Sequence, residues 1–92
     1  MRIVVRRNVA HALAELPEGE EAAVRAALAG IPSAFGRPHI HSGLGLRQLK
    51  RGVYEARVGL HLRAVFTQED DGALHVRLLG NHDDVRRYLR HR

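Results

Sequence analysis

The sequence contains no cysteine, which excludes a disulfide framework and any metal site built on thiolates. Aromatic residues are scarce, with two Tyr, two Phe and no Trp, and they do not repeat in the pattern of an RNA-stacking platform. No run of about 18 apolar residues is present, and the N-terminus lacks a signal-peptide pattern. We therefore expect a cytoplasmic protein that makes no membrane contact.

The 92 residues suffice for one small domain, and no repeat or long linker divides them, so we expect a single domain spanning 1–92. The formal net charge is +5, and nearly all the cations are arginine, whose planar fork suits phosphate. Residues 15–25 carry four glutamates, whereas residues 47–63 carry five cations against one glutamate. This asymmetry favours an anionic partner for the second region, which Arg47, Lys50 and Arg51 would contact.

Three stretches in the second half have the alternation of β-strands, namely 53–58, 60–66 and 74–78. Successive side chains point to opposite faces of a strand, so each stretch has an even and an odd face. The even face is apolar, and we expect it to pack against Leu13, Val24 and Leu28. It comprises Tyr54, Ala56, Val58, Leu60, Leu62, Ala64, Phe66, Leu74, Val76 and Leu78. The odd face is polar and should be wet, and it comprises Glu55, Arg57, His61, Arg63, His75 and Arg77.

The length of the loop between the first two of these strands decides whether their charges share a face. A two-residue Gly59-Leu60 loop would pair Ala56 with Arg63 and turn one set of charges into the core. An odd-length loop, such as a three-residue turn with a bulge, keeps Arg57 and Arg63 on the same side. We therefore expect the odd loop.

The remaining elements follow from breakers and capping residues. A short strand spans 1–5, a helix capped by Asn8 runs to Leu16, and a second helix spans 18–29 with Gly30 as its C-cap. A loop follows over 32–45, Asp70-Asp71-Gly72 forms the last hairpin turn, and Asn81 or Asp83 caps a helix ending at Arg90. This order predicts an α+β fold: an N-terminal strand and two helices packed on a twisted antiparallel sheet, then a short C-terminal helix.

Residues 43–89 resemble the RelE/ParE superfamily of bacterial toxins. The shared pattern is a Leu-x-x-Gly-x-Tyr lead-in (49–54), an Arg-bearing strand with a Gly turn (55–59), and an Arg before an apolar strand (62–66). The closing pattern is a strand that ends in Gly, then a basic or His residue and a short helix (78–85). The resemblance implies a small RelE/ParE-like domain and, in its RelE-like branch, an endoribonuclease that cuts messenger RNA at the ribosome. It also implies a cognate antitoxin protein as partner.

The resemblance also carries over individual site residues. Arg57 matches a phosphate-holding strand residue, Arg63 matches an Arg near the scissile phosphate, and His82 matches the residue after the last strand. Glu55 falls at a position where cutting members carry Lys. Some relatives have a catalytic Tyr soon after the Val of the last helix, but this chain has Arg86 there, which favours His82.

RNA cleavage without a metal needs a base for the 2′-hydroxyl, a cation for the phosphorane and an acid for the 5′-oxygen. His82 is the candidate acid, because histidine changes charge near neutral pH. Glu55 or His61 is the candidate base, and Arg57 and Arg63 form the clamp. His39 and His41 lie two apart in a loop without a carboxylate partner, so we expect neither a metal nor a cofactor. We expect His41 to contact RNA, together with Arg47, Lys50 and Arg51.

Two other functions fit the same residues. The chain could be a non-catalytic, ParE-like inhibitor that binds DNA gyrase, since a basic face also suits a protein partner. It could also be a regulatory homologue that has lost toxicity, because Glu55 stands where cutting relatives carry Lys.

Overall fold

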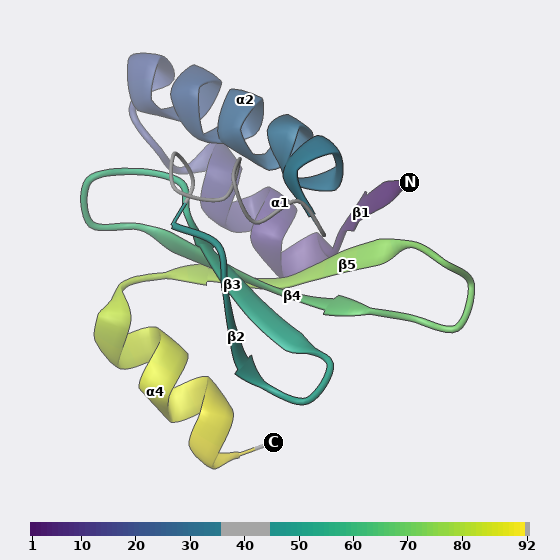
Figure 1. Ribbon diagram of the computed structural model, residues 1–92. Helices are drawn as coiled ribbons and strands as arrows, with labels where there is room; N and C mark the ends of the chain where they lie inside the picture. Colours follow the sequence, from purple (N-terminus) through teal and green to yellow (C-terminus); the bar gives the residue numbers. More distant parts are fainter. Residues whose placement is uncertain (36–44, 92) are drawn as a thin grey trace.

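The computed structural model describes residues 1–35 and 45–91. Its elements follow in the order β1 (Ile3–Val5), α1 (Arg7–Ala14), α2 (Glu18–Ala34), β2 (Arg47–Lys50), β3 (Val53–Arg57), β4 (Arg63–Gln68), β5 (Leu74–Gly80) and α4 (His82–Arg90). The strands form one twisted sheet in the order β1-β5-β4-β3-β2 (Figure 1). All neighbours are antiparallel except β1, which runs parallel to β5. The α+β prediction is confirmed.

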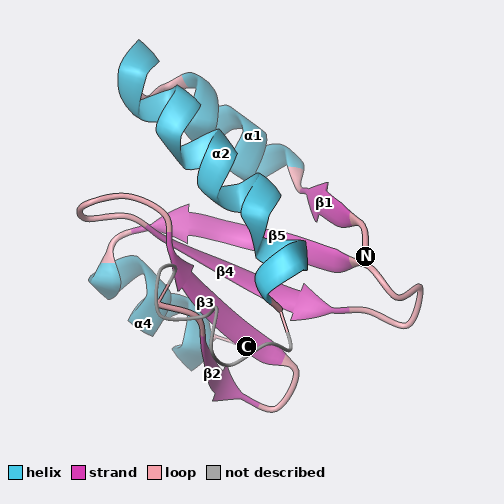
Figure 2. Cartoon of the chain, turned by 45° about the horizontal axis from the view of Figure 1, so that its top comes forward, coloured by secondary structure: helices cyan, strands magenta, loops and turns pink. Residues whose placement is uncertain are grey.

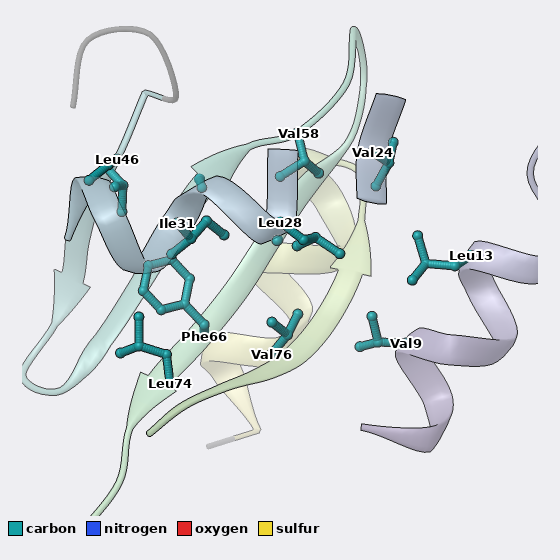
Figure 3. Packing of buried hydrophobic residues seen from close by; sticks show 13 residues of the cluster. Val9, Leu13, Val24, Leu28, Ile31, Leu46, Val58, Phe66, Leu74 and Val76 are labelled. Atoms are coloured by element: carbon teal, nitrogen blue, oxygen red, sulfur yellow. The ribbon is translucent and has the colours of Figure 1, made fainter. Parts of the chain in front are cut away.

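Helices α1 and α2 lie side by side on one face of the sheet, and α4 lies on the other (Figures 1 and 2). The larger core fills the space under α1 and α2, where Leu13, Val24 and Leu28 meet Phe66 and neighbouring strand residues (Figure 3). This is the predicted even face, and the prediction is confirmed for the residues that are buried in this core or packed against it. These are Tyr54, Ala56, Val58, Leu62, Ala64, Phe66, Leu74 and Val76.

Two even-numbered residues depart from that prediction. Leu60 is 87% exposed, because it lies in the loop after β3 instead of in a strand. Leu78 packs on the opposite face, against Val65 and Val85. The reason is a bulge: Val65 pairs with Leu78 but Phe66 pairs with Val76, so Arg77 is an extra residue and the faces of β5 exchange there.

A second, smaller core therefore lies between the sheet and α4. It is built on Val53, Val65 and Val85, all nearly fully buried. Leu49, Leu78, Tyr88 and Leu89 pack around these three residues. The odd face is thus wet only in part, which corrects the expectation that the whole of it is exposed. The start of α4 is fixed as predicted: Asn81 caps it, and Asn81 and Asp84 form a reciprocal capping box.

Three local predictions in the first half are wrong. Helix α1 starts at Arg7, and the side chain of Asn8 donates to the carbonyl of Arg77 at 2.9 Å instead of capping the helix. Helix α2 continues past Gly30 and through Pro32 to Ala34, because Ile31 and Ala34 extend its buried stripe. Strand β2 falls where no strand was predicted, and the loop histidines His39 and His41 lie outside the described residues. Within the described ranges, no helix is both long and apolar enough to cross a bilayer.

Candidate active site

The β3–β4 hairpin places two arginines side by side. Arg57 pairs directly with Arg63 across the strands, so both side chains project from the same face of the sheet. Five residues, 58–62, separate them, and the amides of Val58 and Gly59 both donate to the carbonyl of Leu62, at 3.0 and 3.3 Å. The predicted odd-length loop with a bulge is therefore confirmed, and with it the shared face of the two arginines.

The β5–α4 junction brings a histidine to the same place. Arg63 pairs with Gly80, the last residue of β5, and Asn81 and His82 follow at once. The capping box holds the first turn of α4, so the exposed His82 side chain leaves the helix at a fixed point beside Arg63. The β3–β4 loop and the start of α4 lie at the same end of the sheet, the left end in Figure 1.

A pocket of about 210 Å³ lies between these elements. Four of the predicted site residues line it: Arg57, His61, Arg63 and His82. The remaining lining residues are Leu60, Leu62 and Asn81, which were not predicted as site residues. Asn81 was identified from the sequence only as a helix cap, and its position next to His82 is the signal that places it here. The pocket thus combines two guanidinium groups with two imidazoles.

Glu55 has a different environment from the one predicted. Its side chain is 1% exposed, so it is buried under the odd face instead of forming part of a wet surface. Its Oε1 accepts hydrogen bonds from Arg47 Nε at 2.7 Å and from Arg63 Nη1 at 2.9 Å. The physical reason is cross-strand register: Glu55 faces Arg47 on β2 and Val65 on β4, and both neighbours shield it from water. Glu55 does not line the pocket.

The other basic residues that were predicted to contact RNA do not line the pocket, although Arg47 shares Glu55 Oε1 with Arg63. Arg47, Lys50 and Arg51 are exposed on β2 and on the turn that follows it. Lys50 pairs with Val53 at the start of β3, whereas Arg57 ends that strand, about 13 Å further along at about 3.3 Å per residue. These cations extend the positive surface of the hairpin but do not enter the pocket. Contact of His41 with RNA concerns a residue outside the described ranges.

His75 and Arg77 belong to a separate polar network at the other hairpin. Arg77 forms an ion pair with Glu69 and donates from Nε to Thr67 Oγ1 at 3.1 Å, and His75 lies 3.3 Å from Asp71. Both side chains are half-buried, so the expectation that they are freely solvated is wrong. The backbone amide of Ala73 donates to Asp71 and lowers the pKa of that carboxyl, and His75 and Arg2 act in the same direction.

The fold and the pocket together define a small α+β domain with an arginine- and histidine-lined pocket between a hairpin and the start of a helix. No model of a known family and no curated protein matches the sequence. A chain of the archaeal RelE-RelB complex from Pyrococcus horikoshii OT3 matches the structure with a TM-score of 0.65 and 20% sequence identity. The match covers 87% of this chain and 92% of that one. The chain therefore has the RelE-like fold that the sequence resemblance predicted.

Proposed function

We propose that this chain is the toxin of a type II toxin–antitoxin system and that it cuts messenger RNA on the ribosome without a metal ion. The observation that carries the proposal is the gathering of Arg57, Arg63, His61 and His82 around one pocket. The RelE-like fold supports it, since the similar structure is that of a RelE-RelB complex. A cognate antitoxin is the corresponding partner, and the cytoplasm is the corresponding compartment.

The four side chains supply the groups that transesterification of RNA requires. His61 takes the proton of the 2′-hydroxyl, whose oxygen attacks the phosphorus and forms a 2′,3′-cyclic phosphate. Arg57 and Arg63 stabilise the negative charge that builds on the phosphoryl oxygens. His82 gives a proton to the departing 5′-oxygen, so the downstream fragment begins with a 5′-hydroxyl. Glu55, the other candidate base, is buried and engaged by two arginines, which leaves this role to His61.

Induced expression tests the proposal. We expect growth arrest, with new messenger RNA 5′ ends that carry a hydroxyl instead of a phosphate, and rescue of growth by the antitoxin. Growth arrest without new RNA ends, accompanied by loss of DNA supercoiling, would instead indicate a gyrase inhibitor. Expression that changes neither growth nor RNA ends would indicate a homologue without toxicity.

A further inference from the structure

Glu55 is the buried carboxylate of the described part of the chain, and it holds two arginines. Both Arg47 and Arg63 donate to the same oxygen, Oε1, at 2.7 and 2.9 Å. The second oxygen, Oε2, is buried and has no hydrogen-bond partner among the described residues. A buried carboxylate needs compensating cations and hydrogen bonds, so removal of either arginine would leave the charge of Glu55 partly uncompensated.

The two arginines differ in where they lie. The Arg63 side chain is 30% exposed and lines the pocket, whereas Arg47 is 61% exposed and does not line it. If Glu55 were paired with Arg63 alone, the two charges would cancel and the guanidinium would attract a phosphate only weakly. With Arg47 as the second partner, the three side chains carry a net charge of one positive unit. The pocket then keeps the charge of Arg63 in addition to that of Arg57.

Glu55 also relieves a repulsion. Arg57 and Arg63 pair directly across the hairpin, and like charges at such positions destabilise a sheet. The bond from Arg63 to Glu55 fixes one of the two guanidinium groups and offsets part of the repulsion between them. The buried carboxylate of Glu55 therefore sets the orientation of Arg63 in the pocket.

We propose that Glu55 and Arg47 are positioning residues for the phosphate site, a role that rests on the proposed function and extends it. Glu55 orients the guanidinium of Arg63 toward the pocket. Arg47 offsets the charge of Glu55, so that the charge of Arg63 remains available to the phosphate of RNA. Arg47 therefore promotes RNA binding through Glu55 and not through a contact of its own with RNA.

A double-mutant cycle on binding of an uncleavable RNA oligonucleotide, with 2′-deoxy nucleotides, tests this role. Arg47→Ala in the parent should weaken binding about tenfold, because an uncompensated carboxylate then lies beside Arg63. In a Glu55→Gln background the same substitution should change binding by less than about twofold, because no carboxylate remains to compensate. Lys50→Ala is the matched control: it removes an exposed cation from the same strand and should have the same effect in both backgrounds.

A salt titration in the same two backgrounds gives a second readout. The slope of log affinity against log salt counts the phosphates that cations neutralise, at about 0.7 per phosphate for a single strand. Arg47→Ala should lower this slope in the parent, where the uncompensated Glu55 withdraws Arg63 from a phosphate, and should leave it unchanged in the Glu55→Gln background. A cation that contacts RNA itself lowers the slope in both backgrounds when it is removed. Cleavage adds a third readout: Glu55→Gln should slow the chemical step more than it weakens RNA binding, because a neutral amide orients Arg63 more weakly than a carboxylate does.

The outcomes separate this inference from the proposed function. An equal effect of Arg47→Ala in both backgrounds, on the affinity or on the salt slope, shows direct RNA contact and overturns the inference, even if the parent cuts RNA. If the double-mutant cycle shows coupling but the parent binds RNA without cutting it, the cleavage activity is overturned and the positioning role remains. A parent that does not bind RNA at low salt overturns both.

Discussion

Adding one methyl group at Gly80 should destabilise the junction on which the pocket depends. A Cβ atom at this position would lie 2.6 Å from Asp84 Oδ2 and 2.7 Å from Asp84 Cβ. The second contact involves an atom next to the helix backbone, so rotation of the carboxylate alone does not relieve it. Asp84 must therefore move. Its Oδ2 accepts a hydrogen bond from the backbone amide of Asn81 at 2.9 Å, and this bond is part of the capping box of α4.

The expected cost combines the lost cap with the displacement of the helix. Loss of a helix cap costs about 1 kcal/mol, and the strain of the close contact brings our expectation for Gly80→Ala to about 1–2 kcal/mol. For a domain of this size each kcal/mol lowers the melting temperature by about 4–8 °C. Thermal unfolding followed by circular dichroism measures the shift. Because His82 is the first residue of α4, RNA cleavage should fall as well.

Gly30→Ala is the matched control for this prediction. Gly30 lies inside α2 with nothing within 4 Å of an added Cβ, and alanine stabilises a helix interior by about 0.5–1 kcal/mol relative to glycine. The same chemical change should therefore have opposite signs at the two positions. A Gly80→Ala protein as stable as the parent would refute the argument that close packing against Asp84 fixes the start of α4.

Two further predictions concern stability. The pKa of Asp71 lies below its ordinary value of 3.8. The contribution of Asp71 to the free energy of unfolding is therefore complete above that pH and is lost as the pH falls through the lowered pKa. The free energy of unfolding, measured with urea, should therefore fall more between about pH 5 and about pH 3 for the parent than for Asp71→Asn. An equal fall in both proteins would contradict the prediction. Val85→Ala should cost on the order of 2 kcal/mol, because Val85 is 3% exposed in the small core beneath α4. Hydrogen exchange should then accelerate in α4 more than in α2, and a uniform change would count against a separate core.

The alternation of the strands predicted the site better than it predicted the sheet around it. Arg57 and Arg63 lie on the same face because the loop between their strands has an odd number of residues. Loop length is a local property, and Gly59 and the apolar even positions indicate it. The cap at Asn81 was equally local, and it placed His82 at the start of α4. These short-range signals placed the two arginines and the start of α4, whereas the choice of His82 as a site residue came from the family resemblance.

The parts that were not predicted depend on partners distant in the chain. The bulge at Arg77 moves Leu78 to the second face, and the sequence hides that exchange because Leu78 and Leu79 are both apolar. Strand β2 has only Leu49 as a partly buried residue, so its strand character comes from pairing with β3. The burial of Glu55 follows from that pairing, since Arg47 reaches it only when β2 joins the sheet.

The cleavage rate of pocket variants tests the central claim most directly. Arg63→Ala should lower the rate of messenger RNA cleavage about 10²–10³-fold, and His82→Ala about 10²–10⁴-fold, in proteins shown to be folded. Arg2→Ala is the control, since it removes an exposed arginine at the far end of β5, where β1 adjoins Leu74. Arg77 is less suitable because its bonds to Glu69 and Thr67 are partly buried, whereas the ion pair of Arg2 with Asp71 joins two exposed side chains. Our account predicts that only the pocket variants lose activity, and folded Arg63→Ala and His82→Ala proteins that cut at the parental rate would contradict it.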